Sequence, residues 1–133
     1  MFWAYSLAVF GDAVFVGFIP VRNLDSAREF YCDTLGLKAV EQTPVALVVD
    51  AGGVSVRLVE VPELRPQPVT IAGWLVSDIS STAASLAKAG VPTKRYEGMV
   101  HDEHGVWTAP SGDRIAWFAD PDGNVLSVTM TSG

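Results

Sequence analysis

The sequence has one cysteine, Cys32, and only two histidines among its 133 residues. A single cysteine excludes an internal disulfide and is consistent with a reducing cytoplasm, where we expect the protein to act. Basic residues are also scarce, because nine Lys and Arg stand against fifteen Asp and Glu, for a net charge of −6. This balance argues against nucleic acid as a partner, since such binding depends on clustered positive charge.

The chain also lacks an apolar run long enough to cross a membrane. Residues 1–10 are rich in Phe, Trp and Val. They are fewer than the roughly 20 residues that a spanning helix needs. No basic residue precedes their apolar part, as one would in a signal peptide. We therefore interpret residues 1–12 as an arm that covers apolar surface, and we expect no membrane partner.

What the sequence does contain is an internal repeat. The glycine turns at residues 50–53 (DAGG) and 120–123 (DPDG) each end one apolar run and start another, as hairpin turns do. They lie 70 positions apart, and the two patterns that open helices, at Val21 and Val76, lie 55 apart. Both halves are therefore predicted to contain a strand, a helix, a strand and a hairpin in the same order.

These patterns divide one domain, residues 1–133, into an arm (1–12), a first module (13–61), a proline-rich linker (62–68) and a second module (69–133). Strands are predicted over residues 13–21, 37–41, 45–50 and 54–61, then over 69–76, 93–96, 114–119 and 125–131. Helices are predicted over 24–35 and 79–87, with Asn23 and Asp78 as their caps. Residues 97–113, here called the excursion, have no counterpart in the first half and hold a short strand near residues 106–108.

Two phrases resemble a known family. LDSAREFY followed by LGL (residues 24–31 and 35–37) and FADPDGN (118–124) are similar to phrases of the vicinal oxygen chelate superfamily. That group includes glyoxalase I, extradiol dioxygenases, fosfomycin-resistance enzymes and bleomycin-resistance proteins, and the resemblance covers residues 14–131. It implies an α+β fold of two tandem βαβββ modules, whose curled mixed sheets surround a central cleft, usually in a homodimer.

The resemblance also implies where a metal would sit. Enzymes of this superfamily typically hold a divalent metal with one ligand from the first strand and one from the last strand of each module. Those positions are Val16, Arg57, Ile71 and Ser127 in this chain. Valine, isoleucine and arginine cannot ligate such a cation, and a lone serine hydroxyl is a poor ligand. We therefore predict no metal and no cofactor, as in the bleomycin-resistance-type members, which bind and sequester rather than react.

Strand alternation extends this view of the cleft. If those four positions face it, Phe18 faces it too. Trp117 is placed there as the repeat partner of Leu47, whereas Val48 points toward the helices. An apolar, aromatic cleft with one fixed cation, Arg57, predicts a small apolar or aromatic ligand that carries an anionic group.

Other interpretations of the same residues lead to different functions. In one alternative, Arg57 binds no ligand and forms a structural ion pair with Glu60, Glu63 or a carboxylate of the excursion. His101 and His104 lie in the only cluster of potential metal ligands, HDEH (101–104). They form either a solvated loop tip or a lid that supplies an acid or base near neutral pH. With such a lid the chain would be a lyase- or dioxygenase-like enzyme with a changed, metal-independent mechanism; with no ligand at all it would be a structural subunit.

Overall fold

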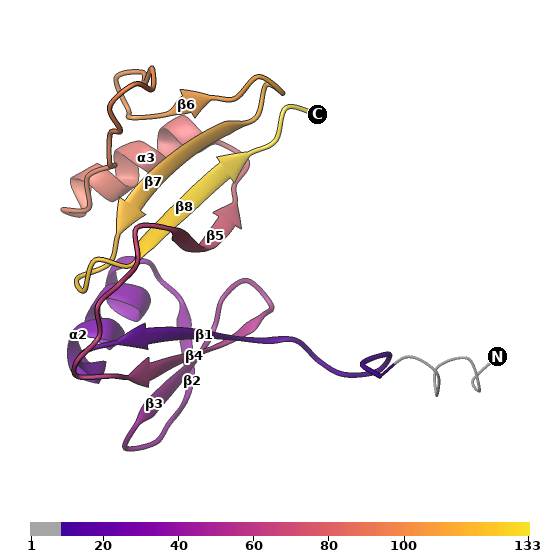
Figure 1. Cartoon of the computed structure of the whole chain (residues 1–133), viewed down its shortest axis with the longest axis vertical. Coiled ribbons are helices and arrows are strands. Elements are labelled where there is room, and N and C mark those ends of the chain that lie inside the picture. The colour runs from indigo at the N-terminus through magenta and orange to yellow at the C-terminus, as the bar shows by residue number, and fades with distance from the viewer. Residues whose placement is uncertain (1–8) are drawn as a thin grey trace.

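The computed structural model describes residues 9–133 and arranges them in two four-stranded sheets, with helical turns packed against each (Figure 1). The first module consists of β1 (Val16–Val21), α2 (Leu24–Arg28), η1 (Glu29–Thr34), β2 (Lys38–Gln42), β3 (Ala46–Asp50) and β4 (Ser55–Glu60). The second consists of β5 (Thr70–Leu75), α3 (Ile79–Lys88), β6 (Trp107–Thr108), β7 (Arg114–Ala119) and β8 (Val125–Met130).

The strand orders are β1-β4-β3-β2 and β5-β8-β7-β6. The pairs β1/β4 and β5/β8 are parallel, and the other pairs are antiparallel. The predicted α+β fold of two tandem βαβββ modules is thereby confirmed. The two sheets stay separate and do not close on each other within the chain.

Both helical segments begin and end where the sequence predicts. The Asn23 side chain accepts a hydrogen bond from the Ser26 amide at 2.9 Å, and Asp78 accepts one from Ser81 at 3.1 Å. Each bond satisfies an amide that the first turn of a helix leaves without a partner. Gly36, at a φ of 83°, follows the first segment in the left-handed conformation that glycine adopts without strain.

The first helix differs from the expected regular α-helix over residues 24–35. After Arg28 it widens into η1, a π-helical segment in which the Leu35 amide donates to the Phe30 carbonyl at 2.9 Å. Two consecutive aromatic side chains of this segment, Phe30 and Tyr31, are both buried in the core, at 7% and 0% exposed.

The predicted strand over residues 93–96 is wrong. Only Lys94 pairs with the sheet, through a single bridge to Trp117. The Tyr96 amide, which a strand would use for pairing, donates instead to the His101 ring. The excursion supplies the fourth strand, β6, which pairs with the start of β7. A short strand near residues 106–108 was predicted, but not that it would complete the sheet.

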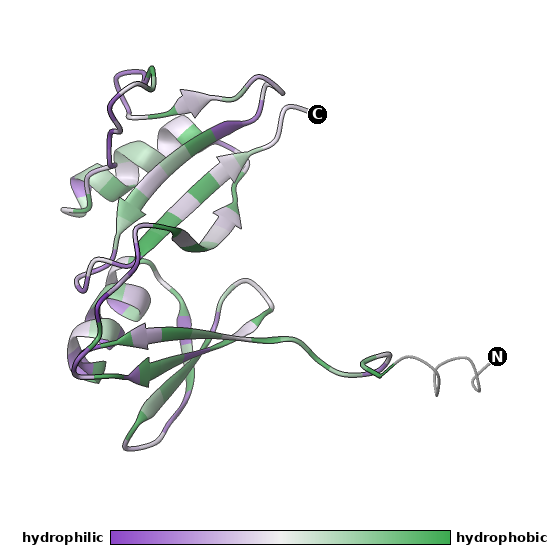
Figure 2. Cartoon of the chain, in the orientation of Figure 1, coloured by the Kyte–Doolittle hydropathy of each residue, from purple (hydrophilic) through white to green (hydrophobic). Residues whose placement is uncertain are grey.

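Each sheet has two different faces, as the alternation of strand residues requires. The side that packs on α2, η1 or α3 is called the helix face here, and the opposite side is the open face. Apolar residues concentrate in the strands (Figure 2). The helix faces contribute fully buried side chains such as Leu47, Leu58, Phe118 and Leu126. Burial of each such side chain contributes about 1.5–3 kcal/mol to folding.

A buried carboxylate joins the two modules. Asp120 is 5% exposed, and its Oδ2 accepts hydrogen bonds from the Tyr31 hydroxyl at 2.6 Å and from Asn124 Nδ2 at 2.8 Å. Asn124 Nδ2 also donates to the Pro20 carbonyl at 2.8 Å. Asp120 Oδ1 accepts from the amides of Asp122 and Asn124, each at 2.9 Å. The hairpin of the second module thus holds both the end of β1 and the first helix.

Two further features surround this junction. Arg22 donates to the Asp122 carbonyl at 3.2 Å and to the Leu64 carbonyl at 3.0 Å, which ties the linker to both modules.

Burial, together with the adjacent Asp120 carboxylate, raises the pKa of the Tyr31 phenol far above its ordinary value. The phenol is therefore a permanent hydrogen-bond donor to Asp120.

Residues 9–15 extend away from both modules (Figure 1). Their apolar side chains are exposed: Val9 at 89%, Phe10 at 80%, Val14 at 85% and Phe15 at 77%. The remainder of the predicted arm, residues 1–8, lies outside the described residues. No helix between residues 9 and 133 combines the length and apolar character needed to cross a membrane.

The junction generates a stability prediction. Tyr31→Phe removes one donor from a buried carboxylate, so we expect the free energy of unfolding to fall by about 1–3 kcal/mol. Urea denaturation followed by far-UV circular dichroism measures this. Tyr96→Phe is the matched control, because the Tyr96 hydroxyl makes no hydrogen bond to residues 9–133. Equal effects of the two substitutions would contradict a specific role for the Tyr31–Asp120 bond.

Candidate ligand-binding site

Strand register places a row of three neighbouring residues on the open face of each sheet. The first row comprises Phe18, Arg57 and Val48. The second row comprises Gly73, Ser127 and Trp117. The two rows occupy equivalent places on β1, β4 and β3 and on β5, β8 and β7. They therefore contain four of the six ligand-binding residues predicted from the sequence.

In the first row, a cation lies over an aromatic ring. Arg57 Cζ is 5.7 Å from the centroid of the Phe18 ring, and Phe18 is 59% exposed. Among residues 9–133, Arg57 forms no ion pair. The ion pair predicted as the alternative is not formed, and one of its candidate partners, Glu60, accepts from the Leu24 amide instead. The ring restrains the guanidinium while its N–H groups stay free for an anion.

In the second row, Trp117 belongs to a group of three aromatic residues, called the aromatic cluster here. Tyr96 meets Trp117 edge-on at 5.5 Å between ring centroids, and Trp107 lies 6.0 Å from it. All three side chains are half-buried. Tyr96 and Trp107 were not predicted as site residues, because both lie in or beside the excursion, which has no counterpart in the first module.

Ser127 pairs with Trp117 and completes the polar part of this row. A Cβ atom at position 73 would come within 2.5 Å of Ser127 Oγ. Only glycine at that place leaves room for the serine hydroxyl on the open face. The hydroxyl is thus a hydrogen-bonding group beside an aromatic surface.

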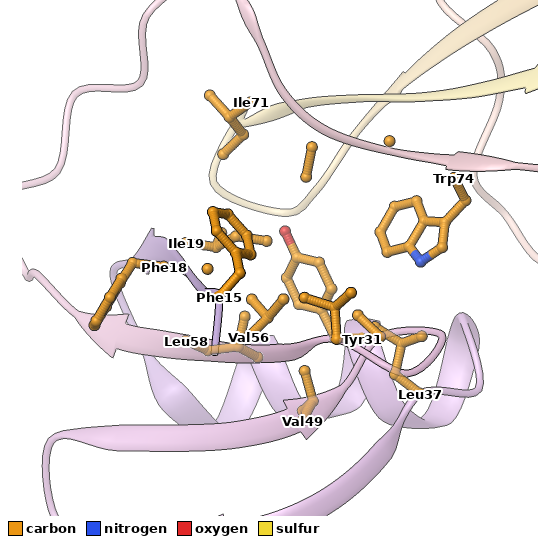
Figure 3. A pocket seen from close by; sticks show the side chains of 15 residues that line it. Phe15, Phe18, Ile19, Tyr31, Leu37, Val49, Val56, Leu58, Ile71 and Trp74 are labelled. Carbon is orange, nitrogen blue, oxygen red and sulfur yellow. The ribbon is translucent and has the colours of Figure 1, made fainter. Parts of the chain in front are cut away.

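The last two predicted residues, Val16 and Ile71, occupy different surroundings. Val16 lies on the open face of β1, two residues before Phe18. Ile71 lies at an irregularity between Thr70 and Ala72, where the alternation of β5 is interrupted. It borders a groove of about 260 Å³ between the modules, whose other walls include Phe15, Val56, Leu58, Tyr31 and Trp74 (Figure 3).

Leu47 and Val48 lie on the faces opposite to those predicted for them. Leu47 is fully buried on the helix face, whereas Val48 pairs with Arg57 on the open face. The reason is that the two hairpin turns differ in length. Residue 50 pairs with residue 55 at the first turn, and residue 119 pairs with residue 125 at the second. The second turn is one residue longer, so Trp117 corresponds to Val48 instead of Leu47.

The charged and aromatic ends of the two rows do not meet within residues 9–133, since no ion pair or aromatic contact joins Phe18 or Arg57 to Trp117. The rows are called half-sites here. Phe18 of the first and Gly73 of the second both border the groove between the modules. Of the two aromatic residues predicted to face the cleft, Phe18 therefore contacts Arg57 and Trp117 does not. Both half-sites are accessible to solvent at their open faces.

His101 uses both ring nitrogens within the protein. Nδ1 lies 2.9 Å from the Gly105 carbonyl, and Nε2 accepts a hydrogen bond from the Tyr96 amide at 3.0 Å. His104 Nε2 lies 3.8 Å from Glu103 Oε1 at the surface. The predicted acid or base at position 101 thus has no free nitrogen in this arrangement. Across the described part of the chain, no three His, Cys, Asp or Glu side chains cluster as a metal site would require.

Asp102 organises the loop that carries both histidines. Its Oδ1 accepts from the amides of His104 and Val106, each at 2.9 Å, and its Oδ2 lies 3.4 Å from Arg114 Nη2. Partial burial acts to raise the pKa of this carboxyl, but the two amides and the charges of His104 and Arg114 outweigh it. The pKa of Asp102 therefore lies below its ordinary value.

The chain resembles several solved structures over most of its length. A glyoxalase/bleomycin resistance protein/dioxygenase from Alicyclobacillus acidocaldarius is 21% identical, with a TM-score of 0.68 over 92% of this chain and 93% of that one. A lactoylglutathione lyase from Agrobacterium tumefaciens is 17% identical, with a TM-score of 0.69 over 90% and 93%. A bleomycin resistance determinant encoded on the transposon Tn5 is 19% identical, with a TM-score of 0.69 over 90% and 98%.

At these identities the structures establish the fold alone. No curated protein matches the sequence significantly. The family model described as the Glyoxalase/Bleomycin resistance protein/Dioxygenase superfamily matches residues 12–128, which include the first module, most of the second and both half-sites. The chain therefore belongs to the glyoxalase/bleomycin resistance protein/dioxygenase superfamily.

Proposed function

We propose that this protein binds a small apolar or aromatic molecule with an anionic group, acts in the cytoplasm and uses no metal. The observation that carries the proposal is the Arg57 guanidinium, which lies over the exposed Phe18 ring and has no ion-pair partner among residues 9–133. Trp117 supplies an aromatic surface. In this proposal the ligand also contacts Val16, Ile71 and Ser127.

The absence of a metal is supported by the chemistry of the first-strand and last-strand positions. Val16 and Ile71 have no donor atom, and Arg57 carries a positive charge that a divalent cation would meet on the same open face. A unit charge about 4 Å from a divalent ion costs several kcal/mol at an effective dielectric constant of about 20.

Purified protein is therefore expected to contain no stoichiometric transition metal. Elemental analysis of protein expressed in zinc-, nickel- and manganese-supplemented medium measures this. A Ser127→Ala variant is the matched control, because its metal content should equal that of the wild type. About one metal ion per chain that resists a mild chelator would contradict the proposal.

A homodimer is the second part of the proposal. Arg57 and Trp117 are not in contact across residues 9–133, and residues 9–15 expose four large apolar side chains. An apolar patch of this kind is unusual on a monomer. If the first open face of one copy lies against the second open face of another, each pair of half-sites encloses one ligand.

Sedimentation equilibrium at tens of micromolar should accordingly give the mass of a dimer. Replacing Phe10 and Phe15 together by serine should shift the equilibrium toward monomer, because it removes apolar area from the arm. Val100→Ser is the control, since Val100 is 86% exposed but lies on the excursion. A wild-type monomer, or equal dissociation by both variants, would overturn this part of the proposal.

Arg57 provides the direct test of the ligand class. Naphthoate and the uncharged naphthylmethanol are matched probes for isothermal titration calorimetry. Arg57→Leu should weaken naphthoate binding about 10- to 100-fold, because a charge-assisted hydrogen bond contributes about 1.5–3 kcal/mol. Naphthylmethanol binding should change little, and so should the melting temperature.

Arg28→Leu is the control variant, since Arg28 is also exposed but donates to Gln42 away from the open face. It should bind both probes as the wild type does. A sharp fall in melting temperature for Arg57→Leu would assign Arg57 a structural role. Equal losses for both probes would contradict anion recognition.

A further inference from the structure

The aromatic cluster is held together by His101. The ring accepts a hydrogen bond from the Tyr96 amide, and the backbone of His101 forms an antiparallel bridge with Trp107. Tyr96 and Trp107 are the two residues whose rings contact Trp117. One residue of the excursion therefore contacts both neighbours of Trp117 on the open face.

The two partners of the ring determine where its proton lies. A carbonyl oxygen can only accept, so the contact with Gly105 requires a proton on Nδ1. A backbone amide can only donate, so the contact with Tyr96 requires Nε2 to be unprotonated. A second proton would occupy Nε2 and place two donors against each other, which breaks the bond to Tyr96.

The surrounding charges do not compensate a protonated ring. The titratable and charged groups on the adjoining segments are those of Lys94, Arg95, Tyr96, Glu97, Asp102, Glu103, His104 and Arg114. The Asp102 carboxylate is bound to two amides and Arg114, and Glu103 is near His104. Arg95 donates to the carbonyls of Asp102 and Glu103. Among residues 9–133, no carboxylate pairs with His101.

We propose that His101 is a proton-sensitive positioning residue for the aromatic cluster. The neutral ring holds Tyr96 and Trp107 against Trp117, and the protonated ring releases Tyr96. The ordered cluster binds one proton fewer than the released one, so it is favoured at higher pH and lost as the pH falls. The consequence for ligand binding rests on the proposed function, whereas the response of the cluster itself does not.

The chain has only two histidines, which makes a matched comparison possible. His101→Gln keeps an acceptor near the Nε2 position but cannot be protonated, and His104→Gln removes the other titrating ring. Nitrogen-15 NMR spectra of full-length wild type and both variants are recorded from about pH 8 to about pH 5. The readouts are the Tyr96 amide, the indole N–H groups of Trp107 and Trp117, and the ring nitrogens of His101.

In the wild type and His104→Gln, the Tyr96 amide and both indoles should shift together with the His101 ring. In His101→Gln they should stay unchanged over the same range. At about pH 8 the ring should show protonated Nδ1 and unprotonated Nε2. The opposite tautomer, a shift that persists in His101→Gln, or one that disappears in His104→Gln would each overturn the inference.

A ligand measurement completes the test. Naphthoate affinity of the wild type should fall, by at most tenfold per pH unit, as the pH is lowered from about 8 to about 5, and in His101→Gln it should change less than about twofold. If naphthoate does not bind at any pH, the proposed function fails while the NMR response still decides the role of His101. If naphthoate binds with the same pH dependence in both proteins, His101 does not position the cluster for binding.

Discussion

The buried carboxylate of Asp120 is the constraint on which the arrangement of the modules depends. A buried carboxylate is strongly unfavourable without partners, and this one has four donors drawn from the hairpin and the first helix. The Tyr31 hydroxyl reaches it from the π-helical segment, in which both Tyr31 and Phe30 are buried. The FADPDGN phrase that the chain shares with its superfamily is thus structural here, because it joins the two modules.

The open faces remain exposed as a consequence of this junction. The first helix and the second hairpin meet, so the helix faces share one continuous core and the two rows of site residues lie outside it. The exposed position of Arg57 lowers the stability of the fold little, since a solvated guanidinium that lies over an aromatic ring needs no carboxylate partner. Function can therefore change at these rows without disturbing the core, which allows the fold to carry an arginine at a position where the sequence resemblance implies a metal ligand.

Most of the fold follows from local signals in the sequence. The caps at Asn23 and Asp78, the glycine turns and the apolar alternation all act over a few residues, and the structure has each of them. The errors arise where one residue changes a side-chain direction or a pairing partner. Because the second hairpin turn is longer by one residue, Val48 and not Leu47 is the open-face counterpart of Trp117. Because the pairing of β5 is irregular before Ala72, Ile71 borders the groove. The strand over residues 93–96 failed because a histidine side chain, which no periodicity describes, took the Tyr96 amide.

Divergence between the repeats explains how two copies of one module can form a single site. The first row is large at Phe18 and Arg57 and small at Val48, whereas the second row is small at Gly73 and Ser127 and large at Trp117. In the proposed homodimer these rows are complementary in size as well as in chemistry. The first row supplies the charge, and the second supplies the aromatic surface together with a hydroxyl. In that arrangement Arg57 selects a planar anion over an uncharged aromatic molecule, and Trp117 of the other copy adds aromatic surface.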